Sequence, residues 1–168
     1  MVLICLLIAY LLWRSYKYNK VLLEKNRRLL TEIEQREREE QQAIVQLKAE
    51  PQEKLTANQQ LFCRICDLMD GPDHIYTDTD LDRSRLAHLL GTNEHYVTDA
   101  ISTCTKGKSV KDFLNDYRLR HATHLLATTN DSVALIAELS GFSRSSFFRI
   151  FSDAYGMSPS DYRKVASK

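Results

Sequence analysis

The chain has 168 residues, and its 23 basic and 22 acidic side chains give a net charge of +1. This length accommodates one domain of ordinary size together with an extension. The near-neutral composition argues against a non-specific, charge-driven nucleic-acid binder, which would be strongly basic, but it does not exclude a sequence-specific one.

The first predicted element is an apolar helix over residues 1–16. Residues 1–13 contain no charged side chain, and Arg14, Lys17 and Lys20 follow them. Thirteen helical residues span about 20 Å, which is short of the roughly 30 Å hydrocarbon core of a bilayer. Aromatic residues near the end of the run and the cations beyond it favour a cytoplasmic C-terminal side. We therefore predict a single-pass helix of the inner membrane, truncated at a mis-assigned start, with a buried or partner-bound apolar helix as the alternative.

A charged helix is predicted over residues 17–50, before Pro51 and a polar linker at 51–60. Its sequence fits a heptad frame with alternating spacings of four and three, which indicates a coiled coil and a homodimer through residues 22–47. Three of the eight frame positions are polar or charged, so we expect weak pairing, and a solvated spacer helix is the alternative. The frame positions are Leu22, Asn26, Leu29, Ile33, Arg36, Glu40, Ala43 and Leu47.

The remaining residues, 61–168, form the predicted main domain, which opens with an amphipathic helix ending at the turn signal DGPD, 70–73. Cys63 and Cys66 form a CxxC within it, a spacing that a redox pair or half of a zinc site would need. No second cysteine pair accompanies them, so we interpret both as core or boundary positions. His121 and His124 are three residues apart but also lack a companion motif, and we predict no metal and no cofactor.

Two later stretches have the pattern of a helix-turn-helix, at residues 80–103 and 132–152. In the second, Ala137 allows the helices to cross closely, Gly141 makes the turn, and Phe147 holds the second helix on the first. One such match is weak, but two at a fixed offset are far more specific. The equivalents in the first hairpin, fifty residues earlier, are Ala87, Gly91 and Val97.

A helix predicted over residues 110–127 joins the two hairpins, because its apolar residues form one stripe. A helix of this kind is about 27 Å long. That length can hold two recognition helices near the ~34 Å pitch of duplex DNA, on the same face of the duplex. The predicted fold is therefore all-α, with two helix-turn-helix subdomains behind the N-terminal helices.

Residues 75–164 resemble the DNA-binding domain of the AraC-type (AraC/XylS) transcription regulators. The resemblance implies sequence-specific binding to double-stranded promoter DNA by two recognition helices in successive major-groove segments, and RNA polymerase as a further partner. The stretches that carry it are DFLNDYRLRHATHLL (112–126), IAELSGF (136–142), FFRIF (147–151) and YGMSPSDYRK (155–164).

The exposed positions of the two recognition helices are the candidate DNA contacts. Arginine can read guanine and an apolar ring can contact a thymine methyl group, whereas the acids of the first helix oppose the phosphates, so we expect the second helix to supply more affinity. In the first helix the candidates are Asn93, Glu94, His95, Thr98 and Asp99. In the second they are Ser143, Arg144, Ser145, Phe148 and Arg149. Candidate phosphate contacts, equally well ordinary surface lysines, are Lys106, Lys108 and Lys111.

The sequence contains no phosphate-binding loop, nucleophile motif or acid–base pair, so no enzyme is predicted. The alternative function is a membrane-anchored helical adaptor that binds protein, because residues 61–168 carry 13 basic and 14 acidic side chains and the first recognition helix is acidic. A CxxC redox protein is a third reading, and it requires a reactive thiol of low pKa.

Overall fold

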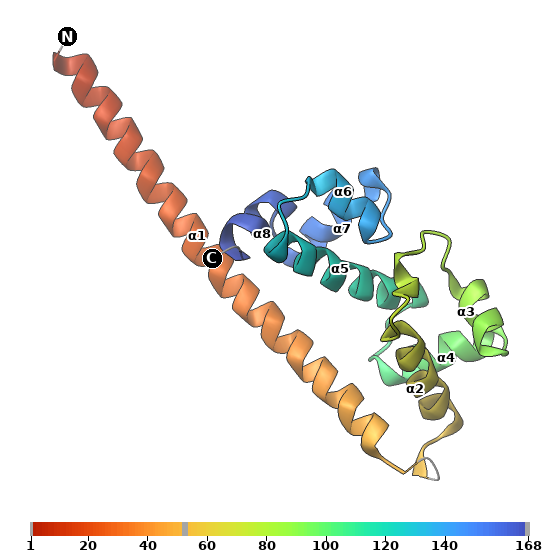
Figure 1. Ribbon diagram of the computed structural model, residues 1–168. Coiled ribbons are helices and arrows are strands. Elements are labelled where there is room, and N and C mark those ends of the chain that lie inside the picture. The colour runs from red at the N-terminus through yellow and green to blue at the C-terminus, as the bar shows by residue number, and fades with distance from the viewer. Residues whose placement is uncertain (1, 52–53, 167–168) are drawn as a thin grey trace.

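The computed structural model describes residues 2–51 and 54–166, with side chains from residue 6 onward. Within these residues all regular structure is helical and there is no strand, which confirms the all-α class. One long helix, α1 (Val2–Ala49), runs beside the helices that follow it, and its N-terminal part extends beyond them (Figure 1). The other helices are α2 (Ala57–Met69), the 3-10 helix η2 (Ile75–Thr77), α3 (Arg83–Leu90), α4 (Glu94–Cys104), α5 (Val110–Thr128), α6 (Val133–Leu139), α7 (Arg144–Tyr155) and α8 (Pro159–Ala166).

Polar caps begin most of these helices. Thr56 forms a capping box with Gln59, so α2 begins at Ala57, inside the predicted linker of residues 51–60. At five further helix starts a side-chain oxygen accepts a hydrogen bond from the backbone amide three residues later, which satisfies a donor that the helix leaves free. These caps are Asp82, Asn93, Ser109, Ser132 and Ser143.

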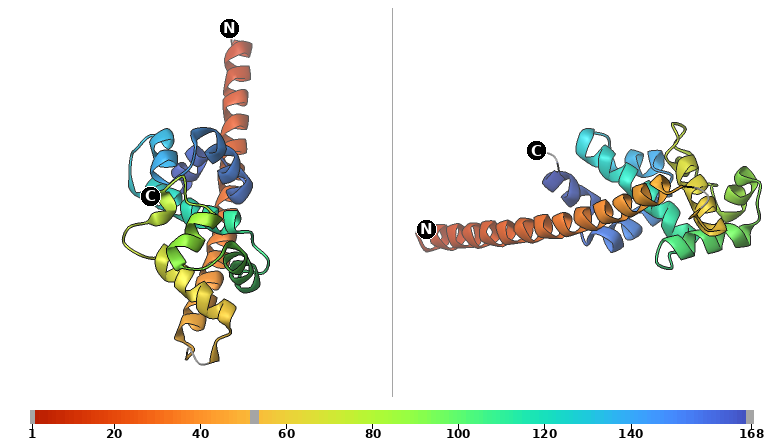
Figure 2. Two further views of the ribbon diagram at one scale, coloured as in Figure 1. Left: turned by 90° about the vertical axis from the view of Figure 1, so that its right-hand side faces the viewer. Right: turned by 90° about the horizontal axis from the view of Figure 1, so that it is seen from below.

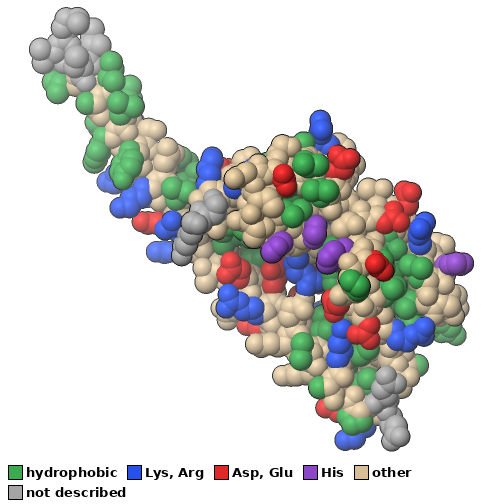
Figure 3. Space-filling model, viewed as in Figure 1, with side chains coloured by type: hydrophobic (Ala, Val, Ile, Leu, Met, Phe, Trp, Pro, Cys, Tyr) green, Lys and Arg blue, Asp and Glu red, His purple; other side chains and the backbone are tan. Residues whose placement is uncertain are grey.

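The prediction of a transmembrane helix at residues 1–16, and with it the inner-membrane location, is wrong. No helix in the described part of the chain has the length and apolar content needed to cross a bilayer. The apolar run is the start of α1, which continues without a break into the charged segment, so cations interrupt the run long before it reaches bilayer length. The exposed hydrophobic side chains of this run lie on the part of α1 that projects beyond the other helices (Figure 3).

The charged part of α1 packs against the chain's own domain. Leu30 is buried there, and Leu29 and Ile33 are half-buried. The predicted heptad frame includes only some of these contacts, since Arg36 and Glu40 within it are exposed. Pairing with a second copy through residues 22–47 would compete with the packing against the domain, and the homodimer stays a prediction.

The domain has two halves, and each half has its own hydrophobic core. The first half consists of α2, α3 and α4, whose core includes Phe62, Val97 and Ile101. The second half consists of α6, α7 and α8, whose core includes Phe147 and Phe151. α5 contributes to both cores, with its N-terminal part in the first and its C-terminal part in the second, and lies between the two halves (Figure 2). It therefore sets the positions of both hairpins.

The CxxC pair belongs to the first core. Cys66 is fully buried and Cys63 is half-buried. Burial is the largest influence on the Cys66 thiol and raises its pKa to about 12, and burial likewise raises the pKa of Cys63. Because the thiolate is the reactive form of cysteine, these surroundings oppose redox chemistry at this pair.

We expect Cys66 to resist alkylation in the folded protein at pH 8, because its thiol is buried and protonated. After unfolding in urea, Cys66 should react at the rate of a free cysteine. Peptide mass spectrometry after a short iodoacetamide pulse measures both states. Rapid modification of Cys66 in the folded chain would instead support the hypothesis of a CxxC redox protein.

Candidate nucleic-acid interface

The two helix pairs α3–α4 and α6–α7 have the same turn geometry. Gly91 and Gly141 both adopt positive φ, at 64° and 74°. In each turn the residue after the glycine donates its backbone N–H to the carbonyl of the helix alanine, over 2.9 Å at Ala87 and 2.9 Å at Ala137. The second helix of each pair then begins three residues after its glycine, at positions fifty residues apart. The repeat in the sequence is therefore a repeat of structure.

In α7 the apolar side faces the core and the opposite side is open. Phe147 and Phe151 are fully buried, whereas Phe148 is 45% exposed. Arg144 lies exposed in the first turn, with no ion pair among the described residues. Arg149 is exposed and lies 3.4 Å from the Asp153 carboxylate, a surface pair that costs little to break. This face thus presents two available guanidinium groups and an aromatic ring.

Two serines complete the N-terminal end of α7. The Ser143 hydroxyl accepts the backbone N–H of Ser146 and is exposed, so it caps the helix. Ser145 is also exposed. The N-terminal end of a helix carries partial positive charge and free amides, which favour a phosphate.

In α4 the predicted contact residues largely bond to one another or to α3. Arg83 of α3 donates to the Glu94 carboxylate over 2.7 Å, and His95 lies 3.1 Å from the Asp99 carboxylate. Thr98 donates its hydroxyl hydrogen to a carbonyl oxygen of its own helix. Glu94 therefore has a cationic partner, and its repulsion of phosphate is weaker than its sequence suggests.

Further polar groups border the N-terminal end of α4. Asn93 caps it by accepting the backbone N–H of Tyr96. The Tyr96 ring is 54% exposed, and neither Tyr96 nor Arg83 is among the residues predicted from sequence. Arg83 lies on the preceding helix, and its role depends on how α3 crosses α4, which no spacing in the sequence reveals.

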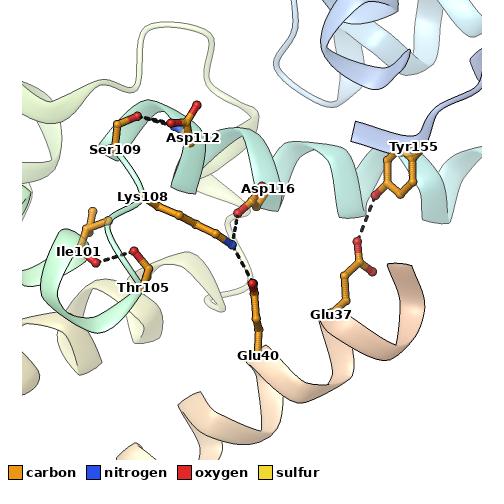
Figure 4. Close-up of polar contacts among 9 residues, drawn as sticks. All are labelled: Glu37, Glu40, Ile101, Thr105, Lys108, Ser109, Asp112, Asp116 and Tyr155. Atoms are coloured by element: carbon orange, nitrogen blue, oxygen red, sulfur yellow. Dashed lines mark hydrogen bonds and ion pairs between the residues drawn. The ribbon is translucent and has the colours of Figure 1, made fainter. Parts of the chain in front are cut away.

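The three candidate phosphate lysines separate in the structure. Lys111 lines a groove of about 710 Å³ with Arg83, Glu94 and Thr98, so it lies beside the first recognition helix. Lys108 instead pairs with Glu40 and Asp116 (Figure 4). Lys106 lines the groove between α1 and the C-terminal end of α4. Only Lys111 therefore remains a good candidate for a phosphate contact.

Histidines gather near the middle of the face shown in Figure 3. His121 and His124 lie in a shallow hollow of about 350 Å³ with His74 from the loop before η2. Burial lowers the pKa of His121, and the two neighbouring histidines lower it further. Among the described residues, no group of three histidine, cysteine or acidic side chains is placed to hold a metal ion.

These features define a double helix-turn-helix domain, and residues 86–165 match the family described as a helix-turn-helix domain. The uncharacterized HTH-type transcriptional regulator YisR of Bacillus subtilis is 35% identical over 78 residues, which are 44% of this chain and 27% of that protein. The chain thus spans about a quarter of that relative's length.

Solved structures share the fold. The C-terminal domain of the two-component response regulator yesN of Fusobacterium nucleatum has a TM-score of 0.54 and 27% identity, covering 60% of this chain and 94% of that one. A Chromobacterium violaceum transcriptional regulator described as AraC-type has a TM-score of 0.57 and 19% identity, covering 66% and 95%. The domain therefore has the double helix-turn-helix fold of these solved domains.

Proposed function

We propose that this chain is a sequence-specific transcription regulator that inserts α4 and α7 into two successive major-groove segments of double-stranded DNA. The observation that supports this most directly is the pair of equivalent hairpins presented by one helix, α5. With 19 residues, α5 is about 28 Å long, close to the ~34 Å repeat of the duplex.

The exposed chemistry differs between the two helices. Arg144, Phe148 and Arg149 of α7 can supply a bidentate contact to guanine, an apolar contact to a thymine methyl group and a phosphate contact. α4 offers mainly Asn93, His95 and Tyr96, with its acids paired. We therefore propose that α7 supplies most of the preference for guanine, and that α4 fits the shape of the major groove and contacts phosphates.

Mobility-shift measurements on fragments of the source genome test this function. The wild-type chain should shift a small subset of the fragments, and its affinity for these fragments should fall as the salt concentration rises. Retention of no fragment above a scrambled background at any salt concentration would favour the protein-binding adaptor. RNA polymerase and a second copy of the chain remain part of the proposal as partners, without an assigned surface.

We predict that Arg149→Ala weakens specific binding by about 1–3 kcal/mol and relaxes preference at one base pair, because a bidentate contact to guanine is lost. Arg144→Ala should weaken specific binding as well. Titrations of specific and scrambled duplexes across a salt series measure both effects. A uniform loss on both duplexes with a shallower salt slope would mean that the arginine contacts phosphate instead. Arg38→Ala on α1, which removes a similarly exposed cation that pairs with Glu34, is the control.

A further inference from the structure

α1 contacts both halves of the DNA-binding domain. Leu30 is 7% exposed and belongs to the second core, where Ile33 also packs. Ile44 and Leu47 pack against the first core. One continuous helix therefore bridges two hydrophobic cores that the rest of the domain joins through α5 (Figures 1 and 2).

Polar contacts reinforce this bridge toward α7 and toward the linker between α4 and α5. The Tyr155 hydroxyl donates to the Glu37 carboxylate over 3.2 Å. The Lys108 ammonium lies 2.8 Å from Glu40 and 2.9 Å from Asp116, so it joins α1 to α5 (Figure 4). Burial is the largest influence on Glu37 and raises its pKa, whereas the bond from Tyr155 lowers it.

A third contact joins the end of α1 to the end of α2. The Lys48 ammonium lies 2.8 Å from Asp67 and 3.0 Å from Asp70. Burial lowers the pKa of Lys48, but its hydrogen bonds to the two carboxylates outweigh this and raise it overall. The cation also lies at the C-terminal end of α2, where the helix dipole favours positive charge. We call the contacts of Glu37, Glu40 and Lys48 the brace contacts.

The interface around the brace contacts is open rather than densely packed. A groove of about 780 Å³ separates α1 from the C-terminal end of α4, and another of about 320 Å³ lies between α1, α5 and the end of α7. Apolar side chains of α1 and the brace contacts therefore hold α1 together, and removal of the brace contacts alone should loosen it without opening either core.

Two of the brace contacts, those of Glu37 and Glu40, lie at or just beyond the C-terminal ends of the recognition helices. Tyr155 is the last residue of α7, and Thr105, which follows α4, lines both grooves. The candidate DNA contacts are in the N-terminal halves of the same helices. On the opposite side of α5, the Gly141 turn approaches the backbone of Thr77 and forms the other junction between the halves. α1 thus limits rotation of one half against the other from its own side of α5 (Figure 1).

We propose that α1 is a brace that fixes the separation of α4 and α7, with Glu37, Glu40 and Lys48 as positioning residues that determine which spacing between the two DNA segments the protein accepts. This rests on the proposed function, because it assumes that both helices read DNA. Adding one base pair between the segments shifts the second by about 3.4 Å and rotates it by about 34°. A rigid domain should bind the DNA with altered spacing much more weakly, whereas a loosened domain can move its two halves to fit that spacing.

The test compares the full-length wild type with the brace variant Glu37→Gln/Glu40→Gln/Lys48→Met. The probe is the genomic duplex that the wild type binds most tightly. Footprinting locates the two segments that the protein covers, and further probes carry one base pair more or fewer between these segments. We expect a penalty of about tenfold or more for the altered spacing in the wild type, a loss comparable to that of a mismatched base pair. In the brace variant this penalty should fall to about threefold.

The control variant is Glu24→Gln/Lys25→Met/Glu32→Gln, which makes the same change in charge at exposed positions of α1. It should keep the wild-type penalty. Simple destabilisation of the variant would weaken binding to both duplexes by the same factor and would leave the penalty unchanged. An equal penalty in wild type and brace variant therefore overturns the inference while leaving the proposed function intact. Failure of the wild type to bind any duplex specifically overturns the proposed function and the inference with it.

Circular dichroism establishes that the brace variant is folded before its binding is measured. If the triple substitution prevents folding, the comparison is made with Glu40→Gln alone, which leaves Lys108 with Asp116. This variant should reduce the spacing penalty by about twofold. An unchanged penalty in folded Glu40→Gln then overturns the inference.

Discussion

Gly141→Ala is expected to destabilise the domain by about 2–5 kcal/mol. Gly141 has a φ of 74°, where an alanine costs about 1–2 kcal/mol. A Cβ there would also lie 2.7 Å from the Thr77 carbonyl oxygen and 2.9 Å from that of Tyr76. Both atoms are backbone, so η2 or the turn must shift, which adds about 1–3 kcal/mol as in other overpacked sites. Urea unfolding followed by circular dichroism measures the loss.

Gly91→Ala is the matched control for this substitution. Gly91 occupies the equivalent turn with a φ of 64°, but a Cβ added there meets no atom within 4 Å. The substitution should therefore cost only about 1 kcal/mol, from backbone strain alone. The reduced freedom of the unfolded chain affects both variants alike and cancels in the comparison. Equal losses would mean that the halves do not meet closely at Gly141.

The repeat of two hairpins could be predicted from the sequence because its turns impose strict local demands. A positive φ selects Gly91 and Gly141, and close crossing selects a small residue four positions earlier. The start of α8 carries a local signal too, because Pro159 is its first residue, a position that proline favours. These features depend on nearby residues, which is why residue types at fixed spacing reveal them.

The position of α1 could not be predicted in this way. A stripe with alternating spacings of three and four fits a second copy of the chain or the chain's own domain, and only tertiary structure decides between them. The sequence frame includes Arg36 and Glu40, which are exposed, and omits Leu30, which is buried. The apolar run at residues 1–13 has the composition of a membrane span but not its length, and no helix of the described residues can cross a bilayer.

For the candidate interface, the sequence predicted which residues lie on the recognition helices but not what their side chains bond to. Arg144 and Phe148 are exposed on α7, as helical periodicity requires. The partner of Glu94 is Arg83, on a different helix, and the partner of Lys108 is Glu40, which is 68 residues away. Such pairs depend on how helices cross, so the sequence overestimated both the repulsion at α4 and the availability of Lys108 to phosphate.

Arg118→Met is expected to cost about 3 kcal/mol of stability, because Arg118 joins α5 to the loop before α3. Its guanidinium donates to the carbonyl oxygens of Tyr76 over 2.6 Å and Asp78 over 2.7 Å, with a longer contact to Leu81 at 3.5 Å. Hydrogen bonds from a charged donor contribute about 1.5–3 kcal/mol each when their loss leaves buried carbonyls unpaired. Methionine fills much of the same volume but donates nothing.

Arg85→Met is the control, because Arg85 is exposed and only approaches Asp78 at 3.6 Å. Its loss should change stability by less than about 0.5 kcal/mol, as expected for an exposed ion pair. Thermal and urea unfolding of the two variants decide the matter. If Arg118 anchors the loop, hydrogen exchange in residues 76–81 should also become faster in Arg118→Met, while exchange in the core of α7 stays slow. Equal stability losses in the two variants would show that the carbonyls find water or other donors, and that the loop does not depend on Arg118.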